Sequence, residues 1–199
     1  MMAEAKDYPQ KAHAAHPRVT GEGRLPGDPT REEILERIIR VDQAGELGAV
    51  RIYAGQIAVL GKGGAGPALR HMAEQEAHHK EAFDKLLVER DVRPTALSPL
   101  WHVLGFALGA GTALLGEKAA MACTEAVEEV IDEHYAAQAA KLGDDEQELR
   151  GTIETFRAEE IEHRDMARES GAREAPAYPL LTGAIKAGSR LAIWLSERL

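Results

Sequence analysis

The sequence contains two Glu-x-x-His pairs, Glu76/His79 and Glu160/His163, in segments whose composition favours helix. Three residues are nearly one helical turn, so the carboxylate and the imidazole of each pair project from the same helical face. A carboxylate oxygen and an imidazole nitrogen placed in this way can bind one metal ion. Because a single such pair is more typical of a solvated helical face, a metal site is indicated only by how the two pairs are arranged along the chain.

A single glutamate precedes each pair by a similar interval. Glu46 lies 79 − 46 = 33 residues before His79, and Glu128 lies 163 − 128 = 35 residues before His163. The chain therefore reads as two helix pairs with matching candidate ligands. Two glycines close to Glu46 cost helix stability, about 1 kcal/mol each relative to alanine. Close approach of another helix, or room for a metal cluster and dioxygen, would explain them.

Four carboxylates and two neutral imidazoles would neutralise two divalent cations. They suit iron or manganese, whereas zinc more commonly takes thiolates or a three-ligand tetrahedral site. One glutamate from each of two helices plus Glu-x-x-His from each of two others resembles the ligand set of ferritin-like di-iron and di-manganese proteins. Iron is favoured if the site performs oxygen chemistry. The choice of Glu128 stays open at this point, because other acids compete on the same helix: Glu125, Glu129 and Asp132.

Helix signals surround these residues. Thr30 and Glu33 have the spacing of a capping box, which predicts a helix that starts there and ends at the glycines of 61–64. Pro67 opens a second helix that runs to about Arg90. Further helices are predicted over about 100–142, with a break near Gly116, over about 145–169 and over 179–199. No window alternates as a strand would. The predicted fold is all-α: a ferritin-like four-helix bundle with additional amphipathic and apolar helices.

Composition bounds the remaining possibilities. We expect the 199 residues to divide into a flexible, Pro-rich arm over 1–30 and one helical domain over 31–199. The single cysteine, Cys123, cannot form an internal disulfide or a rubredoxin-like iron site, and it favours a reducing compartment. The net charge of −9 and the lack of a basic stripe argue against nucleic acid as a partner.

Several motifs resemble the demethoxyubiquinone hydroxylase family of ubiquinone biosynthesis. They are the segments 37–46, 51–56, 100–116 and 195–199, and the resemblance covers the chain from about Arg31 to its C-terminus. It implies that the six ligands of a di-iron centre are Glu46, Glu76, His79, Glu128, Glu160 and His163, which selects Glu128 from among its neighbours. The resemblance also implies accessory roles for His134 and Tyr135. We further expect two carboxylates, Asp42 and Asp132, to orient the ligating imidazoles.

The activity implied by the resemblance is hydroxylation of the ring of a polyprenylated methoxy-benzoquinol, demethoxyubiquinol, with dioxygen. The implied cofactors are two Fe ions, with NADH as the external electron donor. No Gly-x-Gly-x-x-Gly motif follows a predicted strand, so the sequence shows no nicotinamide domain of its own. A lipid-binding accessory protein and further copies of the chain are expected partners. The alternatives are a ferritin-like iron oxidase or storage protein and a metal-free helical scaffold, but a soluble storage shell would not need so long an uncharged segment.

That uncharged segment spans the 22 residues 95–116. Its good apolar run of 17 residues from Leu100 would span roughly 25 Å as a helix, which is marginal for a hydrocarbon core of about 30 Å. We expect the segment to lie at a membrane interface, with core burial, oligomer contact and spanning as alternatives. The last helix, with Trp194 beside apolar and basic residues, can lie on a bilayer similarly. The sequence thus predicts a peripheral membrane protein on the cytoplasmic face of the inner or plasma membrane.

Overall fold

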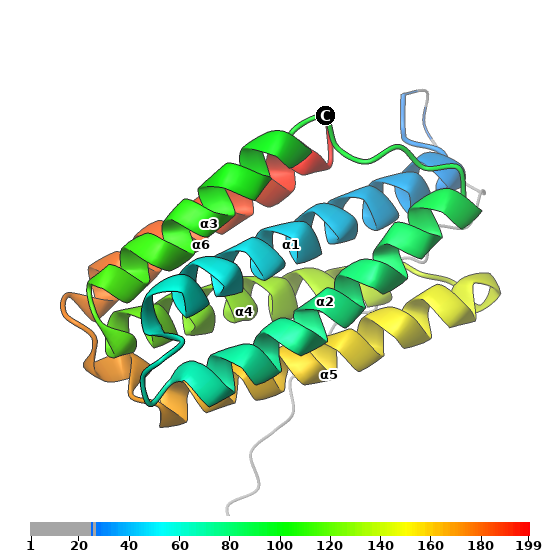
Figure 1. Ribbon diagram of the computed structural model, residues 1–199. Helices are drawn as coiled ribbons and strands as arrows, with labels where there is room; N and C mark the ends of the chain where they lie inside the picture. Colours follow the sequence, from blue (N-terminus) through cyan, green and yellow to red (C-terminus); the bar gives the residue numbers. More distant parts are fainter. Residues whose placement is uncertain (1–24, 26) are drawn as a thin grey trace, which may run out of the picture.

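The computed structural model describes residue 25 and residues 27–199, and it contains no strand within that part of the chain (Figure 1). The α-helices are α1 (Arg31–Leu60), α2 (Gly66–Glu89), α3 (Ser98–Leu114), α4 (Glu117–Ala139), α5 (Gln147–Glu169) and α6 (Tyr178–Ser196). Two short 3₁₀ helices, η1 (Asp144–Glu146) and η2 (Ala172–Glu174), flank α5. The prediction of an all-α fold is confirmed. Most of the arm expected over 1–30 lies outside the described residues.

Local sequence signals set the helix ends. The hydroxyl of Thr30 accepts a hydrogen bond from the Glu33 backbone N–H at 3.0 Å, and the Glu33 carboxylate accepts from the Thr30 N–H at 2.5 Å, so the capping box is present. Gly116 separates α3 from α4 with a φ of 111°, in the region that favours glycine. The predicted break in the stretch over 100–142 is therefore confirmed, and α3 and α4 run in opposite directions (Figure 1).

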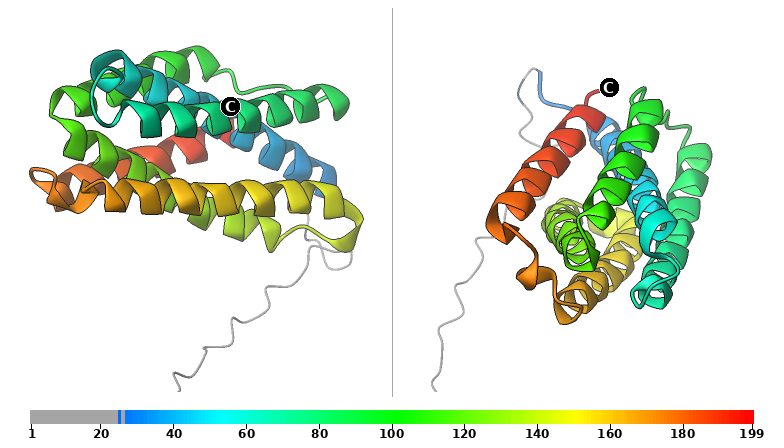
Figure 2. Two further views of the ribbon diagram at one scale, coloured as in Figure 1. Left: turned by 60° about the horizontal axis from the view of Figure 1, so that its bottom comes forward. Right: turned by 60° about the vertical axis from the view of Figure 1, so that its left-hand side comes forward.

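Helices α1, α2, α4 and α5 form the four-helix bundle, and α3 and α6 lie along its outside (Figures 1 and 2). In this arrangement α1 packs against α2 and α3, while α4 packs against α5 and α6. Two apolar clusters fill the bundle. One includes Ile39, Phe83, Tyr135 and Ile153, and the other includes Tyr53, Leu69, Met121 and Ala167. Along each bundle helix the candidate ligands lie between these two clusters, so apolar packing on both sides fixes the four backbones that carry them.

Glycines allow α3 to approach α1 closely. A Cβ atom placed on Gly109 would lie 1.9 Å from the backbone oxygen of Ile52, and one placed on Gly105 would lie 2.9 Å from the backbone oxygen of Gly48. These distances are shorter than a van der Waals contact, so a residue with a side chain would push the two helices apart. Gly55 of α1 serves the same approach, because a Cβ placed on it would lie 2.3 Å from the backbone oxygen of Phe106. The close approach of α3 does not explain the two glycines near Glu46, since a Cβ on Gly48 would meet no atom within 4 Å and one on Gly45 would lie 3.9 Å from Ile131.

A row of acidic residues, one turn apart on α4, fastens α6 to the bundle. The pairs are Glu125 with the hydroxyl of Tyr178 at 2.8 Å, Glu129 with Lys186, and Glu133 with Arg190 at 2.9 Å. Glu125 and Glu129 also bind Arg168 of α5. These contacts set the register of α6 on α4, and they engage two of the acids that compete with Glu128 in the sequence.

Candidate metal centre

Six acidic and imidazole side chains converge in the middle of the bundle, and none is more than 3% exposed. They are Glu46 of α1, Glu76 and His79 of α2, Glu128 of α4, and Glu160 and His163 of α5. One candidate ligand atom from each of Glu46, Glu76, His79 and Glu160 lies within 4.8 Å of the other three, and the same holds for Glu76, Glu128, Glu160 and His163. The six residues that the sequence singled out thus form two adjacent four-ligand positions, which share Glu76 and Glu160.

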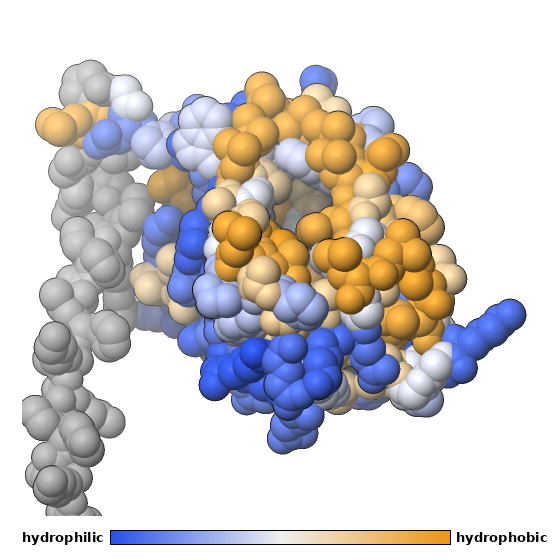
Figure 3. Space-filling view, turned by 90° about the vertical axis from the view of Figure 1, so that its left-hand side faces the viewer, coloured by the Kyte–Doolittle hydropathy of each residue, from blue (hydrophilic) through white to orange (hydrophobic). Residues whose placement is uncertain are grey.

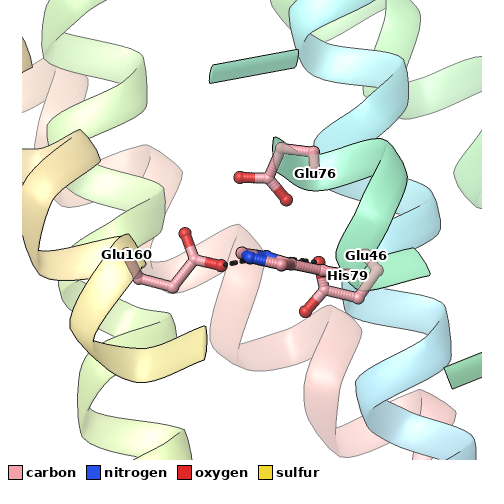
Figure 4. Close-up of side chains that lie close together, drawn as sticks. All are labelled: Glu46, Glu76, His79 and Glu160. Atoms are coloured by element: carbon pink, nitrogen blue, oxygen red, sulfur yellow. Dashed lines mark hydrogen bonds and ion pairs between the residues drawn. The ribbon is translucent and has the colours of Figure 1, made fainter. Parts of the chain in front are cut away.

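Glu160 lies between the two histidines. Its Oε1 atom is 3.1 Å from Nδ1 of His79, and its Oε2 atom is 3.2 Å from Nδ1 of His163. Figure 4 shows the first of these contacts, with Glu46 on the other side of the His79 ring at 3.7 Å from Nδ1. Both imidazoles therefore direct Nδ1 toward the shared carboxylates, which is the orientation that a pair of adjacent cations would use.

Glu76 carries the strongest indication that the cluster holds a further group. Both of its carboxylate oxygens are buried and lack a hydrogen-bond donor, although Oε1 lies 3.2 Å from Nδ1 of His163. Burial, together with the charges of Glu160 and Glu46, raises the pKa of Glu76 well above its usual value. A buried carboxylate without a donor is costly. Cations at this point would satisfy it, and four carboxylates with two imidazoles fit two divalent ions.

The pKa values of four other members of the cluster also depart from their usual values. Burial raises the pKa of Glu46 and of Glu128. Although burial alone would have the opposite effects, hydrogen bonds from His163 and His79 lower the pKa of Glu160 to about 2, and hydrogen bonds to Glu160 and Glu46 raise the pKa of His79 to about 11. Metal ions and protons therefore compete for the same atoms.

A tyrosine hydroxyl holds each of the two single glutamates. Tyr135 of α4 donates to Glu46 of α1, and Tyr53 of α1 donates to Glu128 of α4 at 2.9 Å. Each tyrosine follows the single glutamate of its own helix by the same interval, 53 − 46 = 7 and 135 − 128 = 7. Tyr53 is not among the site residues predicted from the sequence, and this repeated interval is the signal that could have identified it.

The prediction that Asp42 and Asp132 orient the ligating imidazoles is wrong. Asp42 accepts a hydrogen bond from the Gln138 amide at 2.7 Å and lies 3.6 Å from Nε2 of His134. Asp132 pairs with Arg157 at 2.6 Å. His134 thus contacts Asp42 and Gln138 rather than the six clustered side chains, whereas its neighbour Tyr135 reaches Glu46 directly.

Glu159 and Gln75 occupy the role that the two aspartates were expected to fill. Oε2 of Glu159 lies 2.5 Å from Nε2 of His79, and Oε1 of Gln75 lies 3.0 Å from Nε2 of His163. When the outer nitrogen donates its hydrogen, the lone pair of Nδ1 faces inward, as a metal ligand requires. Each partner directly precedes the glutamate of one Glu-x-x-His pair and binds the histidine of the other helix, and this shared place in the sequence is the signal that could have identified both.

An apolar cavity of about 440 Å³ lies against α1 and α4, the helices that carry the two single glutamates. Its lining comes from α1, α3, α4 and α6, and it includes Gly45 and Val127, the residues directly before the two single glutamates. Trp101 donates a hydrogen bond to Ser196 at 2.9 Å and ties α3 to α6 at one end. Figure 3 shows apolar residues around a hollow at the opposite end of the molecule, where α3 ends and α6 begins. An elongated apolar molecule can lie between α3 and α6 with one end near the cluster.

The bundle and its buried carboxylate–imidazole cluster define the ferritin-like class of helical proteins. Residues 33–196 match the family described as "Ubiquinone biosynthesis protein COQ7", and the chain belongs to that family. The family resemblance drawn from the motifs is confirmed.

Relatives of the chain have names that agree with this membership. A Rhodospirillum rubrum protein named "3-demethoxyubiquinol 3-hydroxylase" is 64% identical over 183 residues, which cover 92% of this chain and 86% of the relative. A Homo sapiens protein named "NADPH-dependent 3-demethoxyubiquinone 3-hydroxylase, mitochondrial" is 55% identical over 83% of this chain and 78% of its own length. A Saccharomyces cerevisiae protein named "5-demethoxyubiquinone hydroxylase, mitochondrial" is 45% identical over 83% and 78%, respectively.

Proposed function

We propose that this protein hydroxylates the ring of a polyprenylated methoxy-benzoquinol, demethoxyubiquinol, with dioxygen in ubiquinone biosynthesis. The observation that carries the proposal is the pair of overlapping four-ligand positions beside an apolar cavity. The names of the relatives support the same reaction and give no support to iron storage. The convergence of buried carboxylates also argues against a metal-free scaffold, which would have no use for them.

The six clustered residues would hold two iron ions. When bound, the metal pair supplies the reductive activation of dioxygen that aromatic hydroxylation requires. One ring C–H, one O₂, two electrons and two protons give one C–OH and one water, so an external two-electron donor is needed. We propose NADH for this role, with NADPH as the alternative that the name of the human relative raises.

The chain's own residues would position the reactants and exclude water. Tyr53 and Tyr135 fix the two single glutamates through their hydroxyls. We propose that the quinol ring lies beside Gly45 and Val127, since these cavity-lining residues adjoin Glu46 and Glu128 in the chain. The polyprenyl tail would extend between α3 and α6, where small side chains leave an apolar path.

A direct test gives Fe²⁺-reconstituted protein a demethoxylated quinol, ¹⁸O₂, and either NADH or NADPH. We expect mass spectrometry to find one ¹⁸O atom added to the ring, and the Glu160→Ala variant to form no product, because both ligand positions share this carboxylate. Product without the label would contradict the proposal. Iron mineralisation in a large hollow oligomer would favour the storage function instead.

The outer helices expose apolar side chains that are suited to a membrane surface. On α3 and the turn after it these are Leu100, Val103, Leu104, Phe106, Leu114 and Leu115, and on α6 they are Leu180, Leu191 and Trp194. Arg51 lies over the ring of Phe106, and Arg198 lies over that of Trp194. In the described part of the chain no helix is long and apolar enough to cross a bilayer.

We propose that α3 and α6 rest on the cytoplasmic face of the inner or plasma membrane and receive the lipid substrate there, either directly or from a lipid-binding accessory protein. Self-association through these helices is the alternative use of the same surface. Apolar rows flanked by arginines are typical of helices that lie in a bilayer interface.

Replacing Leu104 and Phe106 together by serine should lower the partitioning of the protein onto liposomes by roughly tenfold, since two half-exposed apolar side chains would leave the membrane. Flotation with vesicles that contain anionic lipid measures this. The control is Val88→Ser, which removes an exposed apolar side chain from α2 and should leave flotation unchanged. Wild-type protein that stays in the soluble fraction would rule out the membrane proposal.

A further inference from the structure

The two ligand positions are built from nearly identical parts. Each has one single glutamate held by a tyrosine hydroxyl, one histidine that faces inward through Nδ1, and the same two shared carboxylates. Helices α1 and α4 each supply the tyrosine that binds the single glutamate of the other. Helices α2 and α5 each supply the residue that binds Nε2 of the histidine on the other. This match means that a difference in cation affinity must come from outside the six ligands.

Such a difference exists at the outer nitrogens of the histidines. His79 donates to the carboxylate of Glu159, at 2.5 Å, whereas His163 donates to the neutral amide of Gln75, at 3.0 Å. Gln75 and Glu159 occupy equivalent places in the sequence, each directly before a motif glutamate. One equivalent position is therefore an anion and the other is neutral.

The anionic partner makes His79 the stronger ligand. A hydrogen bond from an imidazole N–H to a carboxylate is stronger than one to an amide, and it increases the electron density at the opposite ring nitrogen. The ring of Phe156 stacks on that of His79 with 4.0 Å between centroids and covers one face of the ring. Glu159 also brings a further negative charge close to a cation bound by His79 and Glu46.

On the basis of the proposed two-metal site, we infer that the two positions bind cations with unequal affinity and fill in order. The position of Glu46 and His79 fills first because Glu159 supports its histidine. The position of Glu128 and His163 fills second because Gln75 offers only a neutral acceptor. Glu159 and Gln75 are thus positioning residues that set the order of loading.

Titration of the metal-free, full-length protein with Co²⁺ tests the inference, with calorimetry and visible absorption as readouts. We expect two binding steps whose affinities differ by about 10- to 100-fold, the usual effect of an outer hydrogen-bond partner on a metal site. Glu46→Gln should remove the tighter step, and Glu128→Gln should remove the weaker one. These two variants identify which position fills first.

Exchanging the two partners provides the matched variants. Glu159→Gln should weaken the tighter binding step until the two steps merge into one. Gln75→Glu should strengthen the weaker binding step until the two steps merge at a higher affinity. The double variant should separate the steps again, with Glu128→Gln now removing the tighter one. Glu162→Gln makes the same charge change at an exposed site on α5 and should behave as wild type.

Two equal steps in the wild type, or loss of the tighter step in the wild-type background on Glu128→Gln, would overturn the inference while leaving the two-metal site intact. An equal effect of Glu162→Gln and Glu159→Gln would overturn it as well, because general charge rather than the histidine contact would then set the affinity. A wild-type protein that binds no Co²⁺ would remove the two-metal proposal and this inference together.

Discussion

Replacing Glu76 by glutamine should abolish tight binding at both cation positions and leave the metal-free protein at least as stable as the wild type. Glu76 belongs to both ligand groups. Its removal should cost more affinity than the loss of an outer partner, hence more than about 100-fold at each position. Without metal, burial already favours the neutral form of this side chain, because its pKa is raised well above the usual value. A neutral amide of the same shape therefore replaces a buried carboxyl group that destabilises the metal-free protein.

Two measurements separate this outcome from simple misfolding. Thermal unfolding followed by circular dichroism should give equal or higher stability for the metal-free variant, while Co²⁺ raises the unfolding temperature of the wild type alone. Hydroxylation should fall to background. Glu74→Gln, an exposed change of the same charge on α2, is the control and should keep both properties. A Glu76→Gln variant that still binds two cations tightly would contradict the assignment of this carboxylate as a shared ligand.

Replacing Gly109 by alanine should destabilise the fold strongly. The added Cβ would lie 1.9 Å from the backbone oxygen of Ile52, so α3 must move away from α1 along their whole contact. Overpacking against backbone costs about 3 kcal/mol, which corresponds to a fall of about 10 °C in Tm for a chain of this size. Because α3 also lines the apolar cavity, the binding of substrate should weaken along with stability.

Gly111 provides the matched control for this change. It lies two residues further along α3, and a Cβ placed there would have no atom within 4 Å. Gly111→Ala should therefore stabilise the protein slightly, by roughly 0.5–1 kcal/mol, through the lower helix propensity of glycine. Equal Tm values for the two alanine variants would show that the α1–α3 contact is looser than the structure implies.

Much of the fold could be predicted because its signals are local. The capping box at Thr30 and Glu33 and the glycine at 116 depend only on neighbouring residues, and both act as the sequence indicates. The Glu-x-x-His spacing is local as well. The choice of Glu128 was different, because it depends on which acids other helices neutralise. Arg168 of α5 binds two of the competing acids, Glu125 and Glu129. The spacing of residues along α4 alone does not show this pairing.

The outer partners of the histidines were missed for a related reason. Asp42 and Asp132 lie on α1 and α4, but the partners come from the helix opposite each histidine. Such pairs depend on how α2 and α5 are aligned against each other. This alignment can be inferred only when the two halves of the chain are compared position by position. In that comparison Gln75 corresponds to Glu159, and Tyr53 corresponds to Tyr135.

The bond between Trp101 and Ser196 ties α3 to α6 at one end, and the hollow in Figure 3 lies at the other end. A cavity closed at both ends would limit the length of the tail, and it would exclude a tail that is one isoprene unit too long. Here the additional carbon atoms of a longer tail can extend out of the open end, beyond the side chains that line the cavity. For the proposed substrate, the protein would then recognise the headgroup and the first few units, and quinols of different tail length would be equivalent to it.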